Sequence, residues 1–567
     1  MFQGTSNSRQ KSANEVIRLF DLQIAHSQES IRVLKCRRNG RLPISKLPVE
    51  ILSEIFLLHQ QNVMDTKRHP RVQSLNWIGI SHVCRQWRET ALNFSDLWIH
   101  IPCHHPKWAE EMVVRSKQAC LIVRITQYDP LHYPSKAQFL KNFLQQHLSR
   151  IQVLEIQNAW NRAVEKLFEA IQPSSVPCLS TLNVSTCWDE PPIVAALRVE
   201  ILDSRLLNTT SLRRVAISAN VRWCSKLFNG LTHLKLGPGN DSIPSRTQTS
   251  QPEFLDALRR MPTLQLLDLK GMVLPAVVDR SSLEPVHLSE LQDLSIIDTA
   301  PPIAFFLHHV KFSSTTRTSI GCKDVLQLED VAPVISLLER LLSERPHTLK
   351  FDHIAFTINL EYRRDSNWVM EFKAWVSAGS SLLGNPNSNP DFTFFLGWTF
   401  DQMKILRRGS AIDELTVGIF EIFPQDDVVS LLLSSYCQGK YFRPFARKIG
   451  QLPALDTIRI KYVYYVPFLL ELEEGDDPSM PIYPALRHLQ FTSKFRMDDP
   501  TLTALYDFLK KRSEQGLGPE KLSVDVRGLG KVDKTATALL NGVVDVVWVT
   551  PSDSRGPDSG DSDSDSA

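Results

Sequence analysis

A short apolar pattern recurs along this chain and limits the folds that it can adopt. The pattern is apolar-x-x-apolar-x-apolar, as in Ile151-x-x-Leu154-x-Ile156. Its successive middle residues are Leu154, Leu182, Val215, Leu234, Leu267 and Leu294. The last two apolar positions alternate as in a half-buried strand, and helix-like segments such as 163–171 and 253–261 lie between occurrences. One such unit cannot bury its apolar side alone, so the units must stack.

This recurrence resembles an irregular leucine-rich repeat, in which a strand lines one face and a helix returns the chain. The resemblance implies an α/β solenoid of parallel strands and helices, which we assign to residues 108–550. The pattern weakens between residues 300 and 406, and helices are expected at 428–436 and 502–511. It returns as strands at Leu415, Leu455, Leu486 and Leu522. The repeats vary in length and lack the usual Asn or Cys after the strand, so a chance pattern is the alternative.

Residues beside the buried strand positions point to the opposite side of a sheet. In a solenoid such variable positions line the concave face, and the resemblance implies that this face binds a protein substrate. The candidate substrate-binding residues are Glu155, Asn183, Arg214, Lys235, Asp268, Ser295, Arg459 and Gln490. The alternative is a solvated face with no partner.

Residues 47–98 predict two helices separated by a polar loop. The apolar residues of the first helix form two stripes, Val49, Leu52 and Phe56 on one and Ile51, Ile55 and Leu58 on the other. A helix that is apolar almost all round must be covered on both sides. The second helix, expected between Ile80 and Ala91, has one apolar face and cannot cover both stripes. We therefore expect another protein, or the rest of this chain, to complete the core.

The motifs of this stretch are Leu-Pro-x-Glu-Ile-Leu-x-Glu-Ile-Phe, then Val-Cys-x-x-Trp-Arg, then a closing Leu-Trp. They resemble an F-box of the fungal type, assigned to residues 45–101. The resemblance implies a substrate-recognition subunit of a Skp–cullin–F-box ubiquitin ligase, which binds a Skp-type adaptor and through it a cullin. A helical hairpin within a larger core is the alternative, and the long loop from Gln60 to Ser74 departs from the family's pattern.

Ten residues of these motifs are the candidate adaptor-binding residues. They are Leu47, Pro48, Ile51, Leu52, Ile55, Val83, Cys84, Trp87, Leu97 and Trp98. Some of them must form the module's own core, and the sequence alone does not separate the two groups.

Residues 14–38 predict a helix that ends before Gly40. Its apolar seam steps by three and four residues, which is a heptad pattern with one polar position. The seam consists of Ile17, Phe20, Ile24, Ser27, Ile31 and Leu34. Self-association through 14–38 is one interpretation, and packing on the neighbouring helices or a solvated lead-in is the other.

Composition excludes several classes of function. The 567 residues are 43% hydrophobic and 22% charged, as in soluble globular proteins, and the net charge of +2 offers no basic field for nucleic acid. The nine cysteines are scattered without a Cys-x-x-Cys pair, which fits a reducing compartment. No secretory signal or membrane-spanning run is expected. We therefore expect a cytoplasmic or nuclear protein that binds neither nucleic acid nor membrane.

No catalytic motif stands out, and no cofactor or metal is expected. Gly528-Leu529-Gly530-Lys531 lacks the spacing of a phosphate loop, and the adjacent residues of Cys103-His104-His105 rarely face one metal. The ends, residues 1–13 and the acidic tail 551–567, are expected to be disordered.

Three hypotheses remain. The chain is a non-catalytic receptor of a ubiquitin ligase, a structural repeat protein whose F-box-like helices only cap the solenoid, or an enzyme with an unrecognised site. Exposed apolar surface on the two helices of residues 47–98 would favour a binding partner and hence the first hypothesis.

Overall fold

The computed structural model divides the chain into two compact units. The first comprises Met1–Trp188 and Ile201–Leu212, and the second comprises Asp189–Glu200 and Arg213–Ala567. The fold is mixed α/β, with helices at the N-terminus and mainly parallel strands after them. The described residues are 5–65, 75–126, 134–186, 199–218, 223–237, 249–271, 273–276, 283–344, 351–359, 368–376, 390–398, 402, 411–423, 425–435, 443–461, 483–492, 499–517, 521–525, 538, 541–543 and 546–549.

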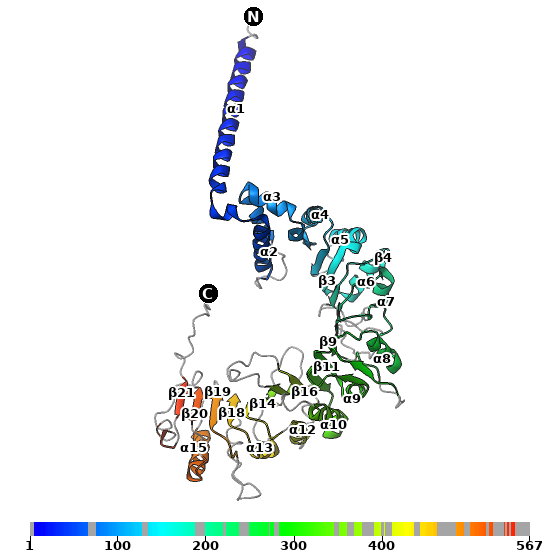
Figure 1. Ribbon diagram of the computed structural model, residues 1–567, viewed down its shortest axis with the longest axis vertical. Coiled ribbons are helices and arrows are strands. Elements are labelled where there is room, and N and C mark those ends of the chain that lie inside the picture. The colour runs from blue at the N-terminus through cyan, green and yellow to red at the C-terminus, as the bar shows by residue number, and fades with distance from the viewer. Residues whose placement is uncertain are drawn as a thin grey trace. The chain divides into compact units, whose positions relative to one another are not determined.

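The first unit begins with helices and continues with short parallel strands (Figure 1). Its α-helices are α1 (Thr5–Gly40), α2 (Val49–Asp65), α3 (Arg85–Asn93), α4 (Pro106–Arg115), α5 (Pro134–His147), α6 (Asn161–Glu169) and most of α7 (Val199–Arg205). Its 3-10 helices are η1 (Pro43–Lys46), η2 (Leu75–His82), η3 (Ser95–Trp98) and η4 (Leu148–Arg150). Its strands are β1 (His100–Ile101), β2 (Leu121–Thr126), β3 (Ile151–Ala159), β4 (Ser174–Ser175), β5 (Thr181–Thr186) and β6 (Leu206–Leu207).

Helix α1 begins earlier than the sequence predicts. It starts at Thr5, within the segment 1–13 that we expected to be disordered, and it ends at Gly40, beyond the predicted end at Arg38. The added residues contain neither proline nor glycine and include the good helix formers Arg9 and Lys11. Nothing in this stretch stops the helix from extending toward the N-terminus.

The second predicted helix of the 47–98 stretch is interrupted. It consists of η2 and α3, because the backbone of Cys84 is extended, with φ −156° and ψ 172°, where a continuous helix would need helical angles. Helix α2, by contrast, is longer than expected and continues to Asp65, into the predicted polar loop.

The sheet of the first unit joins β1, β2, β3 and β5 in chain order, and every pairing is parallel. Parallel neighbours need a crossover connection, which α4, α5 and α6 provide in turn. Along β2 the buried residues Leu121, Val123 and Ile125 alternate with more exposed ones. One face of this sheet is therefore buried, while the other face carries polar residues such as Glu155.

The second unit continues the alternation of strands and helices (Figure 1). Its helices are α8 (Gln251–Arg259), α9 (Ala300–His309), α10 (Leu328–Ser343), α12 (Ala411–Phe420), α13 (Arg443–Gly450) and α15 (Asp499–Glu514). Its strands are β7 (Arg214–Ser218), β8 (His233–Gly237), β9 (Leu266–Lys270), β10 (Val286–Leu288), β11 (Asp293–Thr299), β12 (Val310–Phe312), β13 (Arg317–Lys323), β14 (Phe351–Asn359), β15 (Trp368–Val376), β16 (Phe392–Trp398), β17 (Ser430–Ser435), β18 (Thr457–Lys461), β19 (His488–Thr492), β20 (Lys521–Asp525) and β21 (Val546–Val549).

The predicted repeat positions lie side by side in this sheet. Leu234 pairs with Val215 on one side and with Leu267 on the other, and Leu267 pairs with Leu294. All four side chains are buried, and all of these pairings are parallel, as the recurring pattern predicts. In Figure 1 the helices of this unit follow one side of its strands.

The middle of the second unit departs from the simple order, which explains why the pattern weakens there. Strands β14, β15 and β16 form an antiparallel meander inserted in reverse, so the order is β13, β16, β15, β14, β17. Only β15 runs against its neighbours among the described strands of this sheet. The β14–β17 and β13–β16 pairings are parallel, so the sheet continues through the insertion.

Two predictions in the next segment are wrong and exchange helix for strand. Leu415 lies in helix α12 instead of a strand, because its buried neighbours Ile412 and Ile419 are spaced three and four residues away, which is the helical period. The predicted helix 428–436 is strand β17, in which Leu431 and Leu433 are buried in alternation. The acidic tail 551–567 and the Gly528–Lys531 motif lie outside the described residues.

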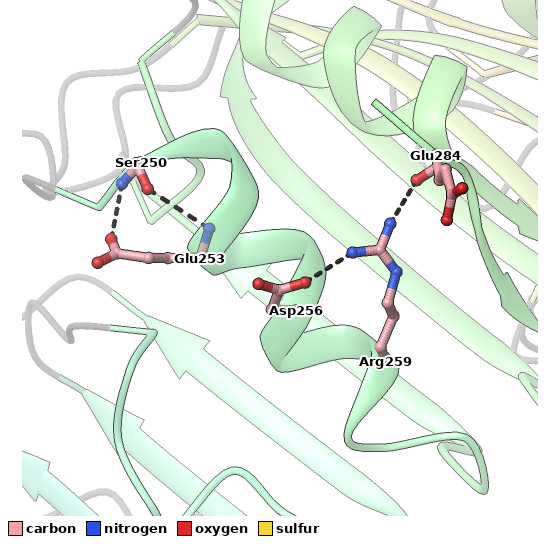
Figure 2. A network of polar contacts seen from close by, with 5 residues as sticks. All are labelled: Ser250, Glu253, Asp256, Arg259 and Glu284. Atoms are coloured by element: carbon pink, nitrogen blue, oxygen red, sulfur yellow. Dashed lines mark hydrogen bonds and ion pairs between the residues drawn. The ribbon is translucent and has the colours of Figure 1, made fainter. Parts of the chain in front are cut away.

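Helix α8 shows how local sequence fixes the start of a repeat helix. Ser250 accepts a hydrogen bond from the Glu253 backbone N–H at 3.4 Å, and the Glu253 carboxylate accepts one from the Ser250 N–H at 3.0 Å (Figure 2). This reciprocal capping box satisfies two N–H groups that the first turn leaves open. At the other end, Arg259 binds Asp256 at 2.6 Å and the Glu284 carbonyl at 2.6 Å, which ties the helix to the next segment.

Candidate functional site

Helix α2 presents two apolar faces, and the chain covers only one of them. Leu52 and Phe56 are buried, whereas Ile51, Ile55 and Leu58 are between 37% and 57% exposed. The exposed residues follow the spacing i, i+4, i+7, so they share one face of the helix, which differs from the face of the buried pair. We call Ile51, Ile55 and Leu58 the α2 stripe. Its exposure means that the folded chain leaves a contiguous apolar row in water.

Aromatic packing holds the buried face of α2 in place. The Phe56 ring lies 5.2 Å from the Trp87 ring, and the Trp77 ring lies 5.2 Å from the Trp98 ring. Trp98 Nε1 donates a hydrogen bond of 2.7 Å to the Ala91 carbonyl, which satisfies the indole in the core. The helical module, residues 43–98, therefore has a core of its own, although it leaves the α2 stripe uncovered.

A buried polar contact that the sequence analysis missed also fixes α2. Gln60 is 1% exposed, and its Nε2 donates a hydrogen bond of 2.8 Å to the Leu97 carbonyl. This bond joins the last turns of α2 to η3. The helical position of Gln60, four and eight residues after Phe56 and Leu52, was the available signal that it lies on the buried face.

The structure separates the ten candidate adaptor-binding residues into groups. Leu52, Leu97 and Trp98 are buried in the module core, so their side chains cannot contact a partner directly. The exposed group comprises Pro48, Ile51, Ile55 and Val83, and the half-buried group comprises Leu47, Cys84 and Trp87. Only the last two groups can form a docking surface. Val49 and Leu58, which the candidate set omits, are also exposed.

The charges next to the α2 stripe are acidic. Glu50 and Glu54 are exposed on the same helix, one turn apart and next to the stripe. An ion pair of the module, Arg85 Nε to Glu89 Oε1 at 2.7 Å, lies on α3. A partner for this face needs an apolar groove with a basic or polar rim on the side of Glu50 and Glu54.

Five of the eight candidate substrate-binding residues share one register row in the second unit. This row runs through directly paired residues on the face opposite the buried leucines. In strand order it comprises Lys235, Asp268, Ser295, Ser319, Thr393, Lys373, Ala355, Leu432, Arg459 and Gln490, of which Thr393 and Ala355 are buried. The row crosses the inverted meander without a break. We call this surface the polar face.

The other three candidates lie elsewhere. Arg214 pairs with His233, two positions before the row of Lys235, whose own partner is Ala216. Glu155 and Asn183 pair with each other in the first unit. The Glu155 carboxylate is already engaged by Arg124 at 3.0 Å. All eight residues thus lie on the side of their strands away from the buried positions, as predicted, but they do not come together in one row.

Residues that the sequence analysis missed give the polar face an apolar centre. Ile297, Gly321 and Phe395 are paired neighbours in the adjacent row, and the Phe395 ring lies across Gly321, where an added Cβ would be 2.0 Å from the ring. Ile297 and Phe395 are half-buried. We call these three residues the central patch. No signal in the sequence brings them together, because Phe395 lies in the reversed meander and its pairing with Gly321 joins strands that are not consecutive in the chain.

Two ion pairs flank the central patch. Lys270 Nζ lies 3.0 Å from Asp268 Oδ2 on one side, and Lys373 Nζ lies 2.7 Å from Glu371 Oε2 on the other. Oδ1 of Asp268 is buried and accepts no hydrogen bond from any described residue. Burial lowers the pKa of the Arg459 guanidinium further along the row. The face therefore combines an aromatic centre with a charged rim.

The histidines and cysteine singled out by sequence do not form a metal centre. Burial lowers the pKa of His100 and of His104 to about 4, and burial raises the pKa of the Cys103 thiol to about 12. Within the described ranges, no group of three or more His, Cys, Asp or Glu side chains could hold a metal ion. None of the helices in those ranges has the length and apolar character needed to cross a bilayer.

Comparison with known proteins adds no assignment. No protein-family model matches this chain, and no curated protein matches it either. The candidate functional surfaces of this chain are therefore the α2 stripe and the polar face.

Proposed function

We propose that this chain is the substrate-recognition subunit of a Skp–cullin–F-box ubiquitin ligase. In this proposal residues 45–101 are an F-box that docks on a Skp-type adaptor, and through it on a cullin. Residues 108–550 form an irregular leucine-rich-repeat-like solenoid that binds a protein substrate. The chain itself is not an enzyme, and it requires no cofactor.

The α2 stripe is the observation that carries the proposal. Ile51, Ile55 and Leu58 lie away from the module core and are between 37% and 57% exposed. Fully burying an aliphatic side chain of this size contributes about 1.5–3 kcal/mol, and the exposed part of each side chain forgoes its share of this while the face stays in water. A groove on an adaptor that covers the stripe recovers this free energy. The competing hypothesis of a capping module is less well supported, because a cap would bury this face within the chain.

The polar face supports the second half of the proposal. Interfaces concentrate their binding free energy in a few anchors, often aromatic, inside a polar rim. The central patch offers such an anchor in Phe395, and the Asp268–Lys270 and Glu371–Lys373 ion pairs offer the rim. A protein substrate fits this arrangement if it places an apolar side chain on the central patch. A cation and hydrogen-bond donors on either side of that side chain would then face the two ion pairs.

Such a receptor needs no catalytic residues of its own. In the proposed complex the recruited conjugating enzyme transfers ubiquitin, and the receptor raises the effective concentration of a substrate lysine near it. The rate therefore depends on the geometry of two binding surfaces.

Co-purification of the full chain with a Skp-type adaptor tests the adaptor half. The double variant Ile51→Asp with Ile55→Asp should lose the adaptor while keeping its fold, because both side chains are exposed. Val114→Asp is the matched control, since Val114 on α4 is the most exposed large apolar side chain among the described residues, at 73%, and lies outside the module. Failure of the unmodified chain to retain the adaptor, or retention by the double variant, would refute the proposal.

Site-specific photo-cross-linking tests the substrate half. A photoreactive residue at Ser295 on the polar face should capture a substrate in cells whose proteasome is inhibited. The same residue at Asp507, which is exposed on helix α15, should not. Equal capture from both positions would show that the polar face is not the substrate surface.

A further inference from the structure

Helix α1 is the largest element in the first unit that the chain leaves unpacked. Its described side chains from Asn14 to Arg38 are all exposed, including apolar ones. Most helical stability in proteins comes from packing an apolar face against another element. An uninterrupted helix from Thr5 to Gly40, drawn in dark blue in Figure 1, therefore needs a partner that the single chain does not supply.

The exposed apolar residues of α1 follow a heptad register. In the letters abcdefg, Ile17, Ile24 and Ile31 occupy the a positions, and Phe20, Ser27 and Leu34 occupy the d positions. The five apolar members of this seam are between 52% and 63% exposed. β-branched residues at a, with leucine at d, favour two parallel strands over three or four. Here all three a positions are isoleucine, and Leu34 is the one leucine at d. We propose that α1 forms a parallel two-stranded coiled coil with α1 of a second copy of this chain.

The polar residue of the seam favours the parallel arrangement. In a parallel pair aligned in register, each seam residue meets its own copy, so the two Ser27 hydroxyls lie together and can hydrogen-bond. In an antiparallel pair aligned on the same seam, a residues face d residues, and Ser27 packs against Ile24. A buried hydroxyl without a hydrogen-bond partner costs free energy, so the antiparallel pair is the less stable one.

The residues that flank the seam place no like charges together in a parallel pair. In that arrangement each g residue faces the e residue of the following heptad on the other helix. Gln23 at g therefore faces Gln28 at e, and Ser30 at g faces Lys35 at e. Both pairs contain at most one charge, so no repulsion across the flanks opposes the dimer.

The ion pair within α1 lies away from the seam. Arg32 Nε donates to Glu29 Oε2 at 2.7 Å, and the two residues occupy the outer b and f positions. The hydrogen bond from the Arg32 guanidinium lowers the pKa of the Glu29 carboxyl, which keeps that pair charged on the solvent side. The helix thus carries this charged pair on its outer side and keeps its inner side for the seam.

The seam is short, which sets the expected strength. Residues 17–34 span about 27 Å of helix, or nearly three heptads. We therefore expect a reversible dimer with a dissociation constant in the micromolar range. Sedimentation equilibrium of the full chain should show a mass that rises with concentration toward twice the 64.5 kDa of one chain.

Seam and control variants separate this proposal from nonspecific association. Ile24→Asp with Ile31→Asp should weaken the dimer by at least about 100-fold, because two central anchors become charged. Leu19→Asp with Leu22→Asp is the control, since these leucines are at least as exposed but lie at the outer c and f positions. Ser27→Leu should tighten the dimer at least about tenfold by completing the seam.

Orientation is tested by oxidation in a Cys36→Ser background, which removes the exposed native thiol of this helix. Leu34→Cys should form a disulfide-linked dimer with oxidised glutathione, because d positions meet their own copy in a parallel pair. Leu22→Cys should not. A monomer at about 100 μM, a seam variant that dimerises like the control, or no cross-link from Leu34→Cys would overturn the proposal. Adaptor binding does not enter these assays, so the dimer and the ligase proposal can fail separately.

Discussion

Substitution by alanine should affect two neighbouring residues of α2 differently. It should lower stability at Leu52 and adaptor binding at Ile51. Leu52 is 0% exposed and Ile51 is 49% exposed. Leu52→Ala removes about three carbon groups from the core, and each carries about 0.8 kcal/mol of transfer free energy. The cavity that is left adds a further cost of about 24 cal/mol per Å3. We therefore expect Leu52→Ala to lower the free energy of unfolding by about 3–4 kcal/mol.

Ile51→Ala should change the free energy of unfolding by less than about 0.5 kcal/mol, because its side chain is already half in water. It should, however, weaken adaptor binding, whereas Leu52→Ala should weaken binding only by populating the unfolded module. Hydrogen exchange of the α2 amides reports the local free energy of opening, and it avoids treating a long chain as a single two-state unit.

A cost of less than about 1 kcal/mol for Leu52→Ala would refute this assignment, because the core of the module would then lie elsewhere. An equal cost for Ile51→Ala and Leu52→Ala would also refute it, because the α2 stripe would then be packed within the chain. Glu54→Ala on the same helix is the control for a change in helix propensity.

Three further predictions concern stability. Ser250→Ala should cost helix α8 about 1 kcal/mol through loss of its cap, measured by hydrogen exchange of the first turn, and an unchanged rate would count against the cap. Gly321→Ala should destabilise the second unit by about 1–3 kcal/mol, and the cost should largely vanish when combined with Phe395→Ala in a double-mutant cycle. The His100 pKa of about 4 lies below its unfolded value, so its contribution is complete above pH 6.5 and is lost as the pH falls toward 4. His100→Phe should flatten that part of a stability-versus-pH profile, and an unaltered profile would contradict the assignment.

Local periodicity made much of the fold predictable. The alternating pattern around Leu234, Leu267 and Leu294 predicted parallel, buried strand positions, because the period of two places every second side chain on one face. The same alternation predicted which residues, such as Lys235 and Ser295, face away from the leucines. These properties depend on neighbouring residues in the chain, so one sequence suffices to read them.

The segment 411–435 shows where this reasoning stops. The runs around Leu415 and Leu432 each contain enough apolar residues to fit either the helical or the strand period over a short window. Pairing of β17 with β14 and β18 makes that run a strand. Both partners lie outside this segment, so its local sequence carries no direct record of them.

The sequence by itself determined the heptad seam of α1, the alternation of the strands and the fact that α2 is apolar on two sides. Tertiary structure alone decided that Leu52 is core and Ile51 is surface, because burial depends on which side Trp77, Trp87 and Trp98 pack against. It also decided that the polar face crosses an inverted meander without a break. Periodicity records which residues share a face, whereas the identity of the covering element is set by packing between segments that are far apart in the chain.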